Sequence, residues 1–202
     1  MANKMPIVVS HYTRATGYEQ EIEHLKETLE NLKLDYEFEV INTLGSWRAN
    51  SNYCAKQVQC ALINHPNRNI LRVDADARFN SRPILFEDPS FDADIAACIY
   101  DFSYRPNELL GGTMFFRNVD RVKHLVDLWV QFACNSCRRQ ERNGDLLQEI
   151  LLLNSHIRFT SLPPEYCKIF DKMEDCGPAV IEHFQASRRF KRTVNGMKSD
   201  AK

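Results

Sequence analysis

One stretch of the sequence decides the fold: Asn69-Ile70-Leu71-Arg72-Val73-Asp74-Ala75-Asp76-Ala77-Arg78-Phe79. The apolar run from Ile70 to Val73 is short and ends abruptly, which predicts a buried strand. Asp74 then follows at the carboxyl end of that strand. Open α/β sheets bind their ligands at this edge, so we expect the first binding residues here.

Asp74 and Asp76 are spaced i, i+2, and in an extended segment this spacing points both carboxylates to the same side. Two hard oxygen ligands on one side can hold a divalent cation such as Mg²⁺ or Mn²⁺, which would in turn neutralise a diphosphate. The alternative is a solvated acidic turn, because the D-x-D pattern is short and often arises by chance. The motif therefore needs support from the rest of the chain.

Length and composition are those of one soluble globular domain. The chain has 202 residues, of which 44% are hydrophobic and 26% are charged. The net charge of −1 gives no basis for binding nucleic acid or an anionic membrane. No apolar run reaches the length of a membrane span, and the segment from Met1 to Pro6 lacks the features of a secretory signal. We therefore expect a cytoplasmic protein without an integral membrane segment.

The seven cysteines do not fit a secreted disulfide framework, which is more often even in number and found in a shorter chain. Most lie in apolar surroundings, which is typical of reduced core thiols. Cys134 and Cys137 form a C-x-x-C pair, but a zinc site would need two further ligands. Cys167 and Cys176 are irregularly spaced for that role, so neither structural zinc nor a redox function is favoured.

The first half of the chain alternates strand-like and helix-like segments. Residues 6–10 form a β-branched run that predicts a first buried strand. Residues 19–33 place their apolar side chains on one face of an amphipathic helix. Residues 36–40 alternate apolar and acidic side chains, which suits a strand nearer the sheet edge. This β-α-β order implies parallel strands joined by a right-handed crossover.

A second helix is expected from about Ser51 to Asn64. Lys56 lies inside it, where a solvated lysine is the ordinary interpretation and a phosphate contact is the alternative. Further on, residues 94–100 predict another buried strand. The Gly111-Gly112 pair opens an apolar strand, and such a pair permits either a tight turn or close approach of the backbone to a ligand.

Two helices and two strands complete the predicted chain. A long helix runs from Val119 to about Cys137, and a shorter one from Leu146 to Leu153 with Asp145 as its N-cap. Residues 156–160 and 179–184 are strand-like.

The alternation of strands and helices predicts a single α/β domain over residues 1–194. Residues 195–202 are expected to be a flexible basic tail.

In this order the segments resemble the GT-A class of nucleotide-sugar glycosyltransferases, in particular the small bacterial and phage-type transferases. The resemblance covers roughly Ile7 to Lys191. Five segments carry it: Ser10-His11-Tyr12-Thr13, Gly45 to Lys56, Ile70 to Asp76, Gly111 to Asn118, and Glu182-His183-Phe184-Gln185-Ala186-Ser187-Arg188-Arg189-Phe190-Lys191. In that family the first segment meets the nucleobase, the third is the D-x-D element, the fourth lies beside the donor sugar, and the last completes the metal site.

The resemblance implies a Rossmann-like GT-A domain with a mostly parallel central sheet flanked by helices. It implies transfer of a hexosyl or related sugar from a nucleotide diphosphate sugar to a hydroxyl of a glycan, protein or small molecule. Mn²⁺ or Mg²⁺ would stabilise the departing diphosphate. The implied metal ligands are Asp74, Asp76 and His183, with Asp76 as the anchor and Asp74 shared with the ribose. The implied donor-binding residues are Thr13, Lys56, Asp74, Gly111, Gly112, Arg188 and Lys191.

One departure from the family concerns the catalytic base. Family members often carry an adjacent Asp-Gln pair at the start of the helix after the long one, whereas here Asp145 and Gln148 are separated. Inversion would need a general base within hydrogen-bond reach of the acceptor hydroxyl. Asp145 and Glu149 are the candidates by location, with a helix N-cap and a solvated helix residue as their alternative roles. The sequence leaves inversion and retention open.

Two other functions fit the same residues. A domain of this fold that has lost its base would bind a nucleotide sugar or a protein without catalysis. A sugar nucleotidyltransferase is less favoured, because Thr13-Arg14-Ala15-Thr16-Gly17 has a single glycine and is not a glycine-rich phosphate loop.

Overall fold

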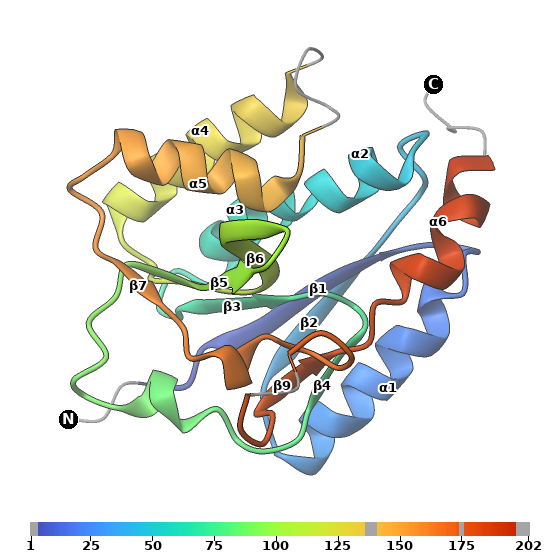
Figure 1. The fold of residues 1–202 in the computed structure, drawn as a ribbon. Coiled ribbons are helices and arrows are strands. Elements are labelled where there is room, and N and C mark those ends of the chain that lie inside the picture. Colours follow the sequence, from blue (N-terminus) through green and yellow to red (C-terminus); the bar gives the residue numbers. More distant parts are fainter. Residues whose placement is uncertain (1–3, 136–140, 174–175, 197–202) are drawn as a thin grey trace.

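The computed structural model describes residues 4–135, 141–173 and 176–196. In these ranges the chain forms a layered α/β fold with one large and one small sheet (Figure 1). The strands of the large sheet are β1 (Ile7–Thr13), β2 (Tyr36–Ile41), β3 (Ile70–Val73), β5 (Ile95–Phe102), β6 (Arg105–Phe116) and β7 (Phe159–Ser161). The strands of the small sheet are β4 (Ala77–Phe79), β8 (Lys168–Ile169) and β9 (Ile181–His183).

The large sheet has the strand order β2-β1-β3-β6-β5-β7. Strand β1 is parallel to β2 and β3, and β5 is parallel to β7. Strand β6 is antiparallel to both of its neighbours, β3 and β5. The predicted α/β class with a mostly parallel central sheet is therefore confirmed, as is the parallel pairing of the first two strands.

Helices cover both faces of the large sheet (Figure 1). They are α1 (Tyr18–Asn31), α2 (Trp47–Asn52), α3 (Cys54–Asn64), α4 (Asp120–Cys134), α5 (Asn143–Leu153) and α6 (Ser187–Gly196), with short 3₁₀ turns at Ile84–Glu87 and Pro164–Tyr166. Val8 packs in the core under α1, while Ile7 and Val9 pack in the core under α3 and α4. This division follows from the alternation of side chains along a strand. No helix within the described ranges is long and apolar enough to cross a membrane.

Several predicted boundaries differ from the structure. The helix expected at residues 51–64 is two helices that meet at Tyr53, and Ser46 caps the first of them by accepting a hydrogen bond from Ala49 N at 3.1 Å. The strand expected to open at Gly111 begins at Arg105 and is part of a long β5–β6 hairpin. No disulfide joins the described cysteines; Cys134 is exposed, and Cys137 lies outside the described residues.

The small sheet determines where the C-terminal segment lies. Strand β4 follows directly after the Asp74-Ala75-Asp76 motif and pairs antiparallel with β9, with Ala77 opposite His183. Strand β8 pairs in parallel with the other edge of β9. This pairing brings His183 next to the end of β3, although the two segments are far apart in the sequence.

The basic segment after β9 forms helix α6, which ends at Gly196, two residues beyond the end of the predicted domain at position 194. Residues 197–202 lie outside the described part of the chain. It packs against α1, where Phe190 and Tyr18 form an edge-to-face pair with centroids 5.2 Å apart. Gly17 permits this contact, because it has a φ of 92° and a Cβ there would lie 2.6 Å from the Phe190 ring. Arg189 also pairs with the buried Glu21 at 2.5 Å.

A buried carboxylate stabilises the start of β5, and its removal is the first prediction. Asp94 is fully buried and accepts hydrogen bonds from Arg121 at 2.6 and 2.8 Å and from the Arg158 guanidinium at 3.0 Å. We expect Asp94→Ala to lower the free energy of unfolding by about 2 kcal/mol at pH 7, the usual loss for hydrogen bonds between charged groups. Urea unfolding measures this loss. Asp92→Ala is the control, because that exposed carboxylate pairs with arginines at the surface. This variant should lower the free energy of unfolding by less than about 1 kcal/mol.

The same carboxylate predicts a pH dependence. Burial would raise the pKa of Asp94, but the hydrogen bonds from Arg121 and Arg158 outweigh it and hold the pKa well below its usual range. A depressed pKa in the folded state stabilises the protein above the unfolded pKa of about 3.9, and this contribution is lost as the pH falls below that value. The stability difference between wild type and Asp94→Asn should therefore shrink between about pH 4 and pH 2. An equal difference at both pH values would contradict the assignment.

Candidate functional site

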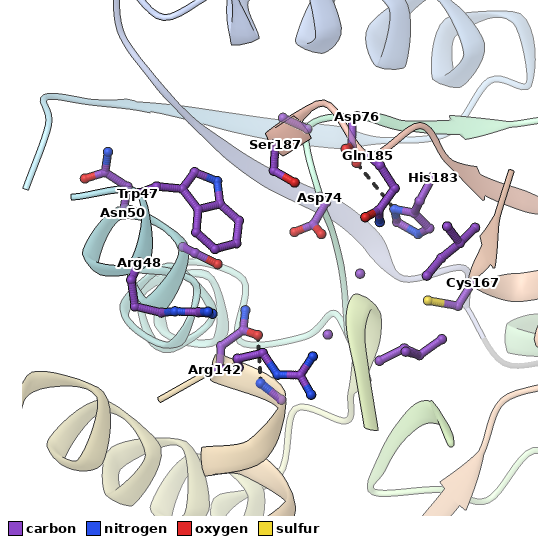
Figure 2. A pocket seen from close by; sticks show the side chains of 18 of the residues that line it. Trp47, Arg48, Asn50, Asp74, Asp76, Arg142, Cys167, His183, Gln185 and Ser187 are labelled. Atoms are coloured by element: carbon purple, nitrogen blue, oxygen red, sulfur yellow. Dashed lines mark hydrogen bonds and ion pairs between the residues drawn. The ribbon is translucent and has the colours of Figure 1, made fainter. Parts of the chain in front are cut away.

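A cavity opens at the carboxyl ends of β1 and β3, the sheet edge at which the sequence places the first binding residues (Figure 2). Its wall is formed by those strand ends, the start of α2, the β5–β6 hairpin, the start of α5 and the segment between β9 and α6. Asp74, Asp76 and His183 all line it.

Asp76 and His183 face each other at the buried side of the cavity. Asp76 Oδ1 lies 3.6 Å from His183 Nδ1, and neither buried atom has a hydrogen-bond partner among the residues that the structure describes. Orphaned buried polar atoms are rare in folded proteins. The separation is too long for a hydrogen bond, but both atoms can reach one cation, since ligand atoms lie about 2.1 Å from Mg²⁺. With Asp74, the three groups offer ligand atoms that lie within 4.8 Å of one another, so the residues fit a divalent cation.

The other polar atoms of these two side chains are held in place. Asp76 Oδ2 accepts a hydrogen bond from Ala186 N at 2.7 Å. His183 Nε2 lies 2.8 Å from Thr113 Oγ1. When Nε2–H donates to the threonine, Nδ1 carries the lone pair that a metal ligand needs. A hydrogen bond to the second ring nitrogen orients histidine ligands in this way at many metal sites.

Asp74 is positioned by Arg72. Arg72 Nη1 lies 2.6 Å from Asp74 Oδ1 and donates to Gly111 O at 2.6 Å. The Arg72 side chain is 2% exposed, whereas that of Asp74 is 46% exposed and faces the cavity. A buried arginine thus fixes a carboxylate that remains accessible to a ligand.

The glycine pair allows strand β6 to pass close to the site. A Cβ at Gly112 would lie 3.0 Å from His183 Cε1, and one at Gly111 would lie 2.7 Å from Asn143 Oδ1. Asp74 N also donates to Gly112 O at 2.9 Å. Both glycines lie within β6 and line the cavity, so the pair does not form a tight turn, and the interpretation that remains is close approach of the backbone to a ligand.

The electrostatics of the site favour positive charge between the carboxylates. Burial lowers the pKa of His183, but the neighbouring Cys167 and the Asp76 carboxylate outweigh it and raise the pKa to about 10. Burial raises the pKa of Asp74, and the charge of Asp76 raises it further against the opposing effect of Arg72. A bound cation would relieve this repulsion, since an ion is usually the largest local charge in such a site.

The opposite end of the cavity is aromatic. Thr13, at the end of β1, lines it together with Tyr18 and Trp47. Trp47 Nε1 donates to Tyr18 OH at 3.3 Å, and Lys191 Nζ lies 4.9 Å from the centroid of a Trp47 ring. Figure 2 shows Trp47 on one side of the cavity and His183 on the other, with Asp74 between them. The indole offers a surface on which a planar ring can stack.

Three of the predicted donor-binding residues, Lys56, Arg188 and Lys191, do not line the cavity, although Lys191 lies beside Trp47. Lys56 is exposed on α3 and donates to Gln59 Oε1 at 2.7 Å. The buried face of α3 includes Ala55 and Val58, so the helical period turns position 56 outward. Arg188 pairs with Asp171 at 2.5 and 2.9 Å and does not line the cavity.

The two candidate bases lie in different surroundings. Asp145 lines the cavity, but its oxygens pair with Arg105 at 2.5 Å and with Arg142 at 3.3 Å. It is inside the first turn of α5 and is not the N-cap, a position held by Arg142. Glu149 lies further along α5 and does not line the cavity. Glu108 lines it, accepts a hydrogen bond from Arg142 at 2.6 Å, and has a pKa that burial raises.

The sequence interpretation missed Arg72, Glu108, Arg142 and Cys167. A signal existed for Arg72, because a charged residue within a four-residue apolar strand must be paired when it is buried. Glu108 and Arg142 come together only when the β5–β6 hairpin packs on α5, and no local pattern indicates that contact. Cys167 likewise lies in a loop without periodicity.

Comparisons with known proteins identify the fold. No protein-family model matches the chain, and no curated protein matches it by sequence. A solved glycosyltransferase involved in the glycosylation of the major capsid of PBCV-1 has a TM-score of 0.71, at 14% identity, over 96% of this chain and 100% of that one.

A larger solved enzyme is similar over part of its length. The glycosyltransferase GlyE of Streptococcus pneumoniae TIGR4 has a TM-score of 0.55, at 14% identity, over 96% of this chain and 62% of that one. The apo form of GlyE has a TM-score of 0.56, at 15% identity, over 97% of this chain and 61% of that one. This chain therefore spans less than two thirds of the length of GlyE. The chain has the GT-A-like fold of these glycosyltransferases.

Proposed function

We propose that this protein is a cation-dependent glycosyltransferase that moves a hexosyl or related sugar from a nucleotide diphosphate sugar to an acceptor hydroxyl. The observation that carries the proposal is the pair of buried, unpartnered atoms Asp76 Oδ1 and His183 Nδ1, with Asp74 beside them. This trio lies at the carboxyl edge of a mostly parallel sheet, where α/β folds bind nucleotides. The glycosyltransferases that share the fold support the same function.

Asp76 and His183 would hold the cation, and the mixed oxygen and nitrogen ligands favour Mn²⁺ over Mg²⁺. The cation supplies stabilisation of the charge that develops on the leaving diphosphate. Asp74, fixed by Arg72, would be shared between the cation and the ribose. Thr13 and Trp47 line the end of the cavity where the nucleobase would lie, and Lys191 adds positive charge beside the indole.

Acceptor activation would take place on the α5 side of the cavity. Asp145 and Glu108 both line this side, and both pair with Arg142. A general base works best when its pKa approaches the operating pH. Burial raises the pKa of Glu108, so Glu108 joins Asp145 as a candidate base, and Glu149, which does not line the cavity, is the weaker candidate.

The test is a panel of nucleotide sugars, with release of nucleoside diphosphate as the measured product. We expect at least one donor to be turned over, EDTA to slow that turnover about a hundredfold or more, and Mn²⁺ to restore it better than Mg²⁺. Turnover that is unaffected by EDTA would contradict cation dependence. Donor binding without any release of diphosphate would indicate a non-catalytic binding domain.

A further inference from the structure

We propose that the acceptor is a saccharide, and that its ring stacks on Tyr104 at the tip of the β5–β6 hairpin. The inference rests on the proposed function, because it names the class of the second substrate. It is carried by the part of the cavity that the donor would leave open. This acceptor lobe is lined by Phe102, Tyr104, Glu108, Arg142, Asp145 and Lys172.

The lobe contains an exposed and prearranged aromatic surface. Tyr104 is 67% exposed, while Phe102 behind it is 8% exposed. Their rings stack with centroids 5.2 Å apart and planes 14° from parallel. A buried ring thus holds an exposed one flat, so little conformational freedom remains to be lost on binding. The apolar C–H face of a sugar ring matches such a surface, and the tyrosine hydroxyl supplies a polar edge.

Lys172 fixes the tyrosine from the other wall of the cavity. Its Nζ lies 3.2 Å from Tyr104 OH and 5.4 Å from the centroid of the Tyr104 ring. Lys172 follows β8, so the contact joins the hairpin to the small sheet. The platform is therefore held by two separate elements.

The polar groups of the lobe suit a hydroxyl-rich ligand. Two cations, Arg142 and Lys172, and two carboxylates, Glu108 and Asp145, line it, so donors and acceptors of hydrogen bonds are both present. Carboxylates accept hydrogen bonds from sugar hydroxyls, and the cationic side chains donate them. Binding sites of this kind combine aromatic walls with a few convergent polar groups.

A second stacked pair offers a matched control. Phe170 and Phe184 stack with centroids 5.6 Å apart and planes 15° from parallel, and both are partly exposed. Arg188 lies over the Phe170 ring at 5.6 Å, and neither phenylalanine lines the cavity. Phe170→Ala therefore removes an exposed stacked ring of the same kind without touching the acceptor lobe.

The experiment is saturation-transfer-difference NMR on the full chain with Mg²⁺ and UDP. The probes are methyl α- and β-glucosides, galactosides and mannosides, and N-acetyl-threonine amide serves as a peptide-type acceptor. We expect signals from the C–H protons of at least one glycoside, an affinity about tenfold weaker in Tyr104→Ala, and wild-type affinity in Phe170→Ala. Retained affinity in Tyr104→Phe would show that the ring face carries the binding.

The outcomes separate this inference from the proposed function. Glycoside signals that are absent, equally strong in Tyr104→Ala, or replaced by binding of N-acetyl-threonine amide alone would overturn the saccharide assignment. Donor hydrolysis in the absence of acceptor is measured on the same variants and should be unchanged in Phe170→Ala, whose ring does not line the cavity. Donor hydrolysis with no glycoside binding refutes only the inference, whereas glycoside binding with no nucleotide sugar bound or turned over refutes the proposed function.

Discussion

Replacing Asp76 by asparagine is expected to slow cation-dependent turnover about a thousandfold, or about 4 kcal/mol of transition-state stabilisation. The amide oxygen of asparagine can still accept the hydrogen bond from Ala186 N that Asp76 Oδ2 accepts at 2.7 Å. The amide nitrogen then occupies the place of Oδ1 and faces His183 Nδ1. A neutral donor replaces an anionic ligand, so the cation loses its anchor while the backbone contact survives.

The fold should tolerate this change. The substitution removes a repulsion between the Asp76 and Asp74 carboxylates. It also removes the attraction between Asp76 and His183, which opposes burial and lowers the pKa of Asp76. Because these two effects oppose each other, thermal unfolding should show a melting temperature within about 4 °C of the wild type. A folded protein without Mn²⁺ affinity would separate a functional role of Asp76 from a structural one.

The measurement pairs Mn²⁺ affinity, by calorimetry or electron paramagnetic resonance, with release of nucleoside diphosphate. Asp171→Asn is the matched control, because it neutralises a carboxylate that pairs with Arg188 outside the cavity. The control should bind Mn²⁺ as the wild type does. Wild-type Mn²⁺ affinity in Asp76→Asn would show that the cation site has been assigned to the wrong residues.

Local patterns were sufficient to predict that Asp74 and Asp76 follow a buried strand at the edge of the sheet. An apolar run that ends in a charge marks the end of a buried strand, and β-α-β alternation puts that end at the binding edge of a sheet. The structure contains both features, with β3 in the interior of the sheet. The amphipathic helix α1 was predictable for the same reason, since its period of apolar residues is local.

The meeting of His183 with Asp76 was not predictable from local patterns. It depends on β4 pairing with β9, and each of these strands has three residues. A slip of one residue in such a pair would turn every side chain to the opposite face, and nothing in either short segment specifies the register with Ala77 opposite His183. The resemblance to a family supplied this partner, and the structure supplied the pairing that places it.

Side-chain direction accounts for the predicted residues that lie elsewhere. Lys56 is close in sequence to residues that line the cavity, but it lies on the exposed face of α3, opposite the buried positions of that helix. The helical period alone would have indicated this orientation. Arg188 points to Asp171, a partner in a loop that no periodic pattern reaches. The sequence position of a residue thus predicts the helix or strand on which it lies. The direction of a charged side chain also depends on the partners that neighbouring elements offer to it.

Replacing Arg72 by methionine is the second large expected effect, with kcat/KM reduced about a hundredfold, or about 2.7 kcal/mol. Arg72 Nη1 contacts both Asp74 Oδ1 and Gly111 O at 2.6 Å, so one group fixes the D-x-D carboxylate and the glycine strand together. Without it, Asp74 loses the ion pair with Arg72 and is free to leave the position that we propose for it between the cation and the ribose. Kinetics with the donor identified by the nucleotide-sugar panel measure the loss.

The effect on stability should be small, and this separates Arg72 from an ordinary core residue. Replacing a buried ion pair by an apolar side chain of similar volume is often neutral or stabilising, because burial of the charge is itself unfavourable. The Asp74 side chain is 46% exposed, so water can solvate it after the change. We expect a melting temperature within about 4 °C of the wild type. If Arg72→Met did not fold, the main role of Arg72 would be to stabilise the fold. Arg72→Lys would then test whether a buried positive charge without the guanidinium group restores folding but not turnover.

Arg68 provides the control, because it makes the same two kinds of contact just before the other end of β3. Its guanidinium pairs with Asp35 at 3.0 Å and donates to Met5 O at 3.0 Å, away from the cavity. Arg68→Met should therefore retain wild-type kcat/KM. If both variants lost turnover equally, arginine would act at each end of β3 by supporting the strand. Loss in Arg72→Met alone would mean that its guanidinium is needed at the cavity, where the carboxylate that it holds is the one exposed to the ligand.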